Sequence, residues 1–333
     1  MNNLKKIGIS ALAGSLATFS AHAVEMSVSG SAKVTYYSLN GDEVTGNPYG
    51  MNTSLAFSGS GDVNGYETTL TIVNNDANSG LSSASLAVDL GDMGKITFDQ
   101  GVGVGGLSTI DDKLPSAYEE TWDSMDAAAT TSSNGLVGMG NSGVFVYSNE
   151  FMGSNISAQF GKGQSVASTD DATGGEGGHG SSWDFAITNS TMYDGMTLGF
   201  GYGHISNANG NKTEGSEDTD THMTGFVTYA MGPVTVGYQA SVREDNTKGG
   251  IDEEASGFGI AINLMDGVSA SYAEREITFM NASADDKTED ATGLALSYTV
   301  GSAKIAVQHN ESDNNDGGTT NDENTEIALS LAF

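Results

Sequence analysis

The sequence predicts an all-β protein: a 16-stranded antiparallel β-barrel that spans a membrane, with long loops at one end and short turns at the other. Three observations predict it. Apolar residues alternate with small or polar ones along most of the chain, short and long connections alternate, and the chain ends on an apolar strand. Alternation of period two is typical of strands with one apolar and one polar face. An even number of strands with alternating links closes into an up-and-down barrel.

The first 23 residues are expected to be removed from the mature protein. Lys5 and Lys6 precede a short apolar stretch, and the small-residue segment Ala-His-Ala follows at 21–23. This is the pattern of a secretory signal peptide with an Ala-x-Ala cleavage site, and the apolar stretch is too short for a transmembrane helix. We therefore expect a signal peptide over 1–23 and one barrel domain over 24–333.

The charge balance is strongly acidic, with 43 Asp and Glu against 12 Lys and Arg and a net charge of −31. Such a chain would be repelled by nucleic acid, which excludes a phosphate-backbone binder. A disordered acidic chain is the alternative, but the regular apolar pattern argues against it. Dense carboxylates favour cations or divalent-cation sites. The sequence has no cysteine, so backbone pairing must hold the fold together without disulfides.

The first and last strands show the alternation clearly. At the start, Val28, Ala32, Val34 and Tyr36 share one face, and Ser29, Ser31, Lys33 and Thr35 share the other. At the end, Ile327, Leu329, Leu331 and Phe333 share one face. An apolar terminal strand would be an exposed edge in a soluble protein. In a closed barrel it pairs with the first strand, and its apolar face meets lipid.

The connections are of two kinds. We expect seven short turns, each combining Gly with Asp, Asn, Ser or Pro, and eight long polar loops. A soluble β-sandwich also shows alternation, but it would rarely run sixteen strands with all long loops at one end. The longest loop, about 100–142, is too long to be idle in a compact domain. The short turns are expected near 60–65, 91–94, 151–154, 193–195, 231–233, 265–267 and 300–302.

Four segments in order carry a family resemblance: "VSGSAKVTYY", "SLAVDLGDMGKITFDQG", "GVFVYSN" and the C-terminal "ALSLAF". Together they resemble the general diffusion porins of Gram-negative outer membranes, in particular the 16-stranded trimeric porins of alphaproteobacteria. The resemblance implies a homotrimer of water-filled barrels, surrounded by outer-membrane lipid and lipopolysaccharide, that passes small hydrophilic solutes by passive diffusion. It implies long extracellular loops, short periplasmic turns and a third loop that folds inward and narrows the pore. It also implies that the barrel assembly machinery reads Phe333.

The third loop holds six acids: Asp111, Asp112, Glu119, Glu120, Asp123 and Asp126. By the resemblance, these would line the pore constriction and face basic side chains on the barrel wall. Lys33, on the polar face of the first strand, is the first candidate for a wall cation, and Lys95, beside a short turn, is the second. The only arginines, Arg243 and Arg275, lie near loop ends. So few basic residues depart from the family pattern and predict a cation-preferring pore.

Two local features are also expected. The segment "LPSAYEETWDSMD" predicts a short helix with Ser116 as its N-cap. The other loops are dense in acid and should spread apart unless divalent ions bridge them, so Asp313 and Asp316 are candidate calcium ligands. No EF-hand loop is present. Beyond this possible calcium, no cofactor is expected.

The sequence gives little support for a dinucleotide-binding site or an enzyme. "GVGVGG" at 101–106 fits the glycine pattern of a dinucleotide site, but no helix of a βαβ unit follows. No His-Glu-x-x-His or Gly-x-Ser-x-Gly motif occurs, so no enzyme is predicted. The alternatives are a non-conducting surface adhesin or structural barrel, a calcium-binding β protein, and a substrate-selective porin. The long third loop favours a channel, since its length has no purpose in a closed adhesin.

Overall fold

The computed structural model describes residues 25–39, 42–43, 47–75, 83–121, 142–161, 179–207, 219–245, 250–280 and 286–333. The expected signal peptide, Asp123 and Asp126 lie outside these ranges. The described chain is almost entirely strand, with a few short 3₁₀ turns. No helix in this part of the chain is long and apolar enough to cross a membrane.

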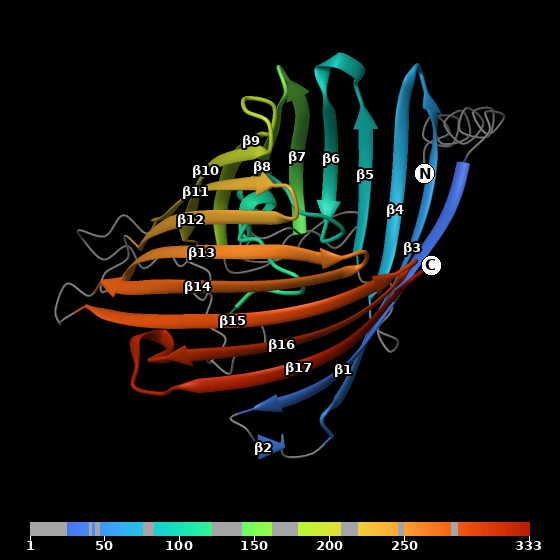
Figure 1. Ribbon diagram of the computed structural model, residues 1–333. Coiled ribbons are helices and arrows are strands. Elements are labelled where there is room, and N and C mark those ends of the chain that lie inside the picture. The colour runs from blue at the N-terminus through green and yellow to red at the C-terminus, as the bar shows by residue number, and fades with distance from the viewer. Residues whose placement is uncertain are drawn as a thin grey trace.

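All seventeen strands of the described chain form one antiparallel sheet that closes on itself (Figure 1). β2 is a two-residue strand within the first loop, and the other sixteen build the wall. The predicted 16-stranded barrel is confirmed. The strands are β1 (Glu25–Leu39), β2 (Asp42–Glu43), β3 (Tyr49–Val63), β4 (Tyr66–Asn75), β5 (Ser83–Asp89), β6 (Lys95–Gln100), β7 (Ser142–Phe151), β8 (Ser154–Gly161), β9 (His179–Asn189), β10 (Met196–Asn207), β11 (Thr219–Met231), β12 (Val234–Asp245), β13 (Asp252–Met265), β14 (Val268–Met280), β15 (Lys287–Val300), β16 (Ala303–Asp313) and β17 (Asp322–Ala332).

The short links fall where the glycines predicted them. The β3–β4 link is Asn64–Gly65, with φ of 56° and 89°, and the β7–β8 link is Met152–Gly153, with φ of 51° and 74°. Two successive residues at positive φ are typical of the type I′ turn, whose twist matches that of a two-stranded ribbon. Gly at the second position carries this conformation without steric cost. Short links therefore alternate with long ones around the ring.

The faces of the barrel reverse the arrangement of a soluble protein. On β17, Ile327, Leu329 and Leu331 point outward and are 47%, 40% and 44% exposed. On the same strand, Asn324 and Glu326 point inward and are buried. The same alternation of exposed apolar and buried polar residues runs through β11 to β16. Such a wall suits an apolar surrounding and a polar interior.

The two ends of the chain close the sheet. β1 pairs with β17 from Ser31–Ala332 to Leu39–Asn324, and β17 (red) lies beside β1 (blue) in Figure 1. Beyond this ladder, the Gly30 N–H donates to the Phe333 carbonyl at 2.7 Å, and the Phe333 N–H donates to the Gly30 carbonyl at 2.9 Å. A Cβ at position 30 would lie 2.6 Å from Cε2 of Phe333. The terminal ring therefore lies over a position that only glycine leaves open.

Replacing Gly30 with Val should displace the Phe333 ring and weaken closure. Overpacking of this kind costs about 1–3 kcal/mol. We expect a smaller fraction of heat-modifiable folded barrel on gels and an earlier thermal transition. Gly225→Val is the matched control, because the Cβ at that outward position on β11 would have only ordinary contacts. Equal folding of the two variants would contradict the role assigned to Gly30.

Candidate functional site

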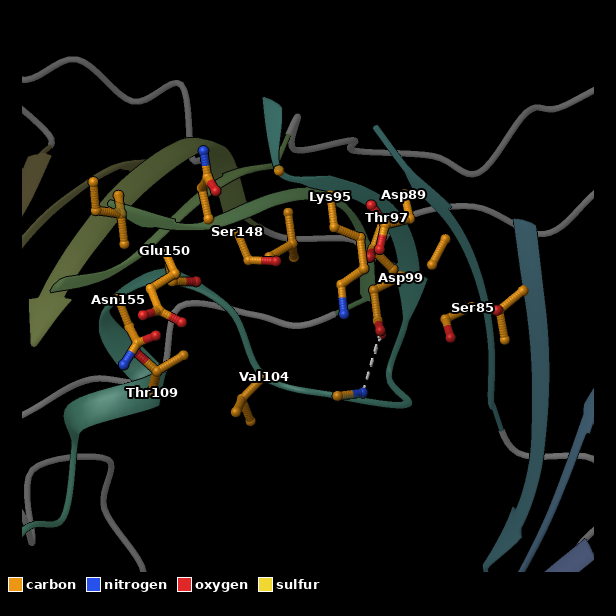
Figure 2. Close-up of a pocket in the computed structure, with 18 of the residues that line it drawn as sticks. Ser85, Asp89, Lys95, Thr97, Asp99, Val104, Thr109, Ser148, Glu150 and Asn155 are labelled. Carbon is orange, nitrogen blue, oxygen red and sulfur yellow. Dashed lines mark hydrogen bonds between the residues drawn. The ribbon is translucent and has the colours of Figure 1, made fainter. Parts of the chain in front are cut away.

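The third loop, between β6 and β7, turns inward directly after the strand ends. Asp99, which is 5% exposed, holds this turn. Its Oδ1 accepts hydrogen bonds from the backbone N–H groups of Gly101 at 2.7 Å and Val102 at 2.8 Å, and Oδ2 accepts one from Gly103 at 3.2 Å. Figure 2 shows Asp99 facing the turn. The glycine-rich "GVGVGG" stretch is therefore the inward bend of the loop, with its amides directed at a carboxylate of the wall.

The loop next packs against β8, β9 and β10 through the 3₁₀ turn η3 (Gly106–Ile110), which lies inside the ring of strands (Figure 1). The Gly106 N–H donates to Ser157 Oγ at 2.8 Å, and the Leu107 N–H donates to Asp184 Oδ1 at 2.5 Å. Leu107 and Ile110 are 1% and 0% exposed and join an apolar cluster with Ala186 and Phe226. This small core inside the barrel fixes the near half of the loop.

Gln239 of β12 holds the middle of the loop. Its Oε1 accepts a hydrogen bond from the Lys113 N–H at 2.8 Å, and its Nε2 donates to the carbonyls of Ile110 at 2.9 Å and Asp111 at 3.0 Å. Gln239 is 7% exposed, so these bonds are largely removed from water. One amide side chain thus satisfies three backbone groups that would otherwise be buried without partners.

A track of glycines on the inner wall lets the loop pack closely against the strands. Leu114 and Pro115 lie over β12 and β13. A Cβ at Gly237 would lie 2.5 Å from Cδ of Pro115, and one at Gly257 would lie 2.7 Å from Cδ1 of Leu114. Non-bonded carbon atoms prefer about 3.5–4.0 Å, so side chains there would push the loop off the wall. The glycines that meet the loop in this way are Gly201, Gly237, Gly257, Gly259 and Gly293.

The far end of the described loop is held by β14 and β16. The Ala117 N–H donates to Ser271 Oγ at 2.8 Å, and the Glu119 N–H donates to Gln308 Oε1 at 3.0 Å. Gln308 Nε2 donates in turn to the Glu120 carbonyl at 2.5 Å. Residues 101–121 therefore follow the inner wall from β6 nearly around to the seam.

The short helix expected at Ser116 is absent from the described part of this segment, so that prediction is wrong there. Ser116 Oγ accepts a hydrogen bond from the Tyr118 N–H at 3.1 Å and donates to the Glu119 carbonyl at 2.7 Å. Ser116 thus caps a bend. The wall supplies the partners that helical hydrogen bonds would have supplied, so the backbone follows the wall.

The seam between the chain ends also holds the loop. Lys33 of β1 forms an ion pair with Glu119, with 2.7 Å between Nζ and Oε1. The Tyr118 hydroxyl donates to Glu326 of β17 at 2.5 Å. Lys33 Nζ lies 5.8 Å from the centre of the Tyr118 ring, and Lys304 Nζ of β16 lies 5.4 Å from it. Lys33 and Glu119, both predicted for the constriction, are thus brought together. The sequence analysis did not identify Lys304, Tyr118 or Glu326 as their neighbours.

Three other acids of the loop lie close together and are partly buried. Burial raises the pKa of Asp112 to about 8, helped by a hydrogen bond and repulsion from Glu120. Burial also raises the pKa of Asp111. Near neutral pH, Asp112 therefore holds a proton. Lys113 opposes both shifts with its positive charge.

The opposite side of the interior is open. A cavity of about 800 Å³ lies beside the loop, lined by strands β4 to β9 (Figure 2). Hydroxyl and amide side chains such as Ser85, Ser148 and Asn155 are prominent in its lining. Lys95, the second predicted wall cation, faces this cavity and stands opposite Asp89 in the strand register, away from the seam. The structure therefore does not bring Lys95 to Lys33.

Both arginines are held by acids. Arg243 pairs with Glu253 at 2.7 Å and with Asp220 at 3.3 Å, and Arg275 pairs with Glu289 at 2.8 Å. All of these side chains are largely buried. The positive charge of the two arginines is thus offset within the wall.

The calcium prediction stays untested. Asp313 is exposed at the end of β16, and nothing is described of the Asp316 side chain. Within the described ranges, no group of three or more His, Asp or Glu side chains could hold a metal ion.

Solved structures with this architecture cover nearly the whole chain. A loop-deletion form of OmpT, an outer membrane protein of Vibrio cholerae, matches with a TM-score of 0.68 and 14% identity over 93% of this chain and 100% of that one. The chain has the fold of the outer-membrane porins. An anion-selective porin from Comamonas acidovorans matches with a TM-score of 0.66 and 11% identity, covering 93% of this chain and 100% of that one.

The outer membrane channel DcaP of Acinetobacter baumannii matches the porin fold of this chain with a TM-score of 0.62 and 12% identity, over 94% of this chain and 98% of that one. A scan against protein-family models found no match, and a search of curated proteins found none. At these identities the likeness establishes the porin fold.

Replacing Gly237 with Val should move the loop toward the open cavity. The added methyl groups would occupy the space of Pro115. We expect a lower single-channel conductance, because the displaced loop narrows the passage. Gly225→Val, which faces outward, is the control. Unchanged conductance in Gly237→Val would show that the glycine track does not set the position of the loop.

Raising the pH from 6 to 9 should increase cation selectivity. The folded protein holds the Asp112 proton up to about pH 8, above the ordinary value of 3.8, so crossing pH 8 adds one negative charge to the loop. The reversal potential in a salt gradient measures this change. Asp112→Asn should reduce the increase, and Glu254→Gln on the outward face of β13 should leave it intact. An equal increase in Asp112→Asn would refute the assignment.

Proposed function

We propose that this protein is an outer-membrane porin, a water-filled channel through which small hydrophilic solutes and ions diffuse passively. The observation that carries the proposal is the position of the third loop. It lies along one side of the interior and leaves a polar cavity of about 800 Å³ along the other. A polar opening beside an inward loop suits a passage that selects by size and charge. No chemical step or energy source is needed.

The proposed constriction combines the third loop with the facing wall. Asp111, Asp112, Glu119 and Glu120 supply the carboxylates of its described part, with Asp123 and Asp126 proposed beside them. Lys33 is a wall cation whose charge Glu119 offsets at 2.7 Å. Lys95 adds one positive charge to the open side, where Asp89, Asp99 and Glu150 also lie.

We also propose that the channel prefers cations, and the argument rests on charge. The chain carries a net charge of −31. Both arginines are offset by carboxylates, so the wall has little free positive charge to attract anions. A passage lined by excess carboxylate raises the local concentration of cations. The fold alone does not decide this, because an anion-selective porin shares it.

The proposed setting is the Gram-negative outer membrane, reached after cleavage of the signal peptide at 1–23. The exposed apolar outer face supports a lipid surrounding, with lipopolysaccharide in the outer leaflet. A homotrimer is proposed because OmpT of Vibrio cholerae, which shares the fold, was solved in a trimer form. Phe333 is proposed as the signal read by the barrel assembly machinery.

The proposal is tested by adding the purified protein to planar bilayers across a salt gradient. Stepwise conductance with a cation-selective reversal potential is expected. Deleting 106–120 should raise the conductance, because it removes the described part of the constriction. Channels that prefer anions would overturn the charge assignment while leaving a porin. A membrane without conductance steps would overturn the channel and favour a non-conducting surface barrel.

A further inference from the structure

A line of hydrogen-bond donors crosses the seam of the barrel near the short-turn end. Ser330 of β17 pairs in register with Lys33 of β1 on one side and with Lys304 of β16 on the other. Asn52 of β3 stands next to Lys33, and Thr299 of β15 stands next to Lys304. Neighbouring strands lie about 4.8 Å apart, so the two lysine backbones are about 10 Å apart with the serine between them.

These side chains face a cavity that differs in charge from the rest of the protein. Its volume is about 380 Å³, and Lys33, Asn52, Ser302, Lys304 and Ser330 line it. Its lining contains no Asp or Glu, although the chain has 43 of them against 12 Lys and Arg. Three other cavities lined by described residues each include at least one carboxylate.

The third loop forms one boundary of this cluster. The centre of the Tyr118 ring lies 5.8 Å from Lys33 Nζ and 5.4 Å from Lys304 Nζ. Both ammonium groups therefore lie against the face of the same ring. The charge of Lys33 is offset by its ion pair with Glu119. Within the described ranges, Lys304 takes part in no ion pair, and it is half-buried at the cavity. Lys304 is therefore a wall cation of this cavity that can meet a solute, as Lys95 is in the larger one.

We propose that Lys304, Ser330 and Lys33 form a binding subsite for a small oxyanion, the phosphate or carboxylate group of a permeating solute. The inference rests on the proposed channel and goes beyond it, because it assigns an anion-retaining position to a passage that favours cations. Ammonium and hydroxyl donors around an oxyanion make charge-assisted hydrogen bonds, which are about twice as strong as neutral ones. The subsite lies on the short-turn side of the loop, so it acts on solutes next to the constriction.

The test uses purified protein in planar bilayers at constant KCl, with inorganic phosphate added to one side and then the other. Binding appears as a concentration-dependent block of the single-channel current. Succinate serves as a second probe, and comparing its half-blocking concentration with that of phosphate tells which oxyanion the subsite prefers. Lys304→Met removes the charge and keeps the length of the side chain. Ser330→Ala removes the hydroxyl and keeps the net charge.

Lys304→Met should raise the half-blocking concentration about tenfold, as expected for one lost charge-assisted hydrogen bond. Ser330→Ala should raise it about threefold, as expected for one lost neutral bond. Lys304→Arg should restore the block, and Lys95→Met, which removes a lysine from the other cavity, should leave it unchanged. An equal effect of Lys95→Met, or wild-type channels that are blocked by neither probe, would overturn the subsite alone. A failure to form channels would overturn the proposed function itself.

Discussion

Closure of the backbone hydrogen-bond ladder between β1 and β17 is the constraint on which the rest of the structure depends. In an apolar surrounding, an unpaired N–H or C=O costs several kcal/mol, so a spanning sheet must have no edge. The ladder meets this requirement from Leu39–Asn324 to Ser31–Ala332, and the Gly30–Phe333 pair extends it to the last residue of the chain. Once the sheet closes, its outer face can be apolar and its inner face polar, because each strand has only two faces to offer.

The inner face carries a second requirement, because a loop must lie against it. Bulky side chains on the wall would fill the interior, and small polar ones alone would not hold a loop in place. The wall instead combines glycines with glutamine side chains. Bare glycines let Leu114 and Pro115 approach the sheet, while Gln239 and Gln308 bond the loop backbone. These contacts place the loop on one side of the interior and leave the other side open.

Most of the fold could be predicted from the sequence, because strand alternation and turn glycines are local signals. The Asn64–Gly65 turn and the apolar face of 327–333 can be identified without knowledge of any distant contact. The loop contacts were not predictable in this way. Gln239 meets Lys113 across 126 positions, and Lys33 meets Glu119 across 86, so these partners depend on strand register and barrel size. The helix expected at Ser116 failed for the same reason, since the wall bonds of Ala117 and Glu119 replaced those of a helix.

The anchors at the far end of the described loop come from both ends of the chain. Lys33 belongs to the first strand, whereas Lys304 and Glu326 belong to the last two, and only the closed ring brings all three to Tyr118. An unfinished barrel, open between β1 and β17, has the glycine track but lacks this last attachment. The order of assembly thus has a consequence for the interior. The last attachment of the third loop is completed in the same step that seals the wall, so a barrel open at the seam is also one whose loop is not yet fixed at its far end.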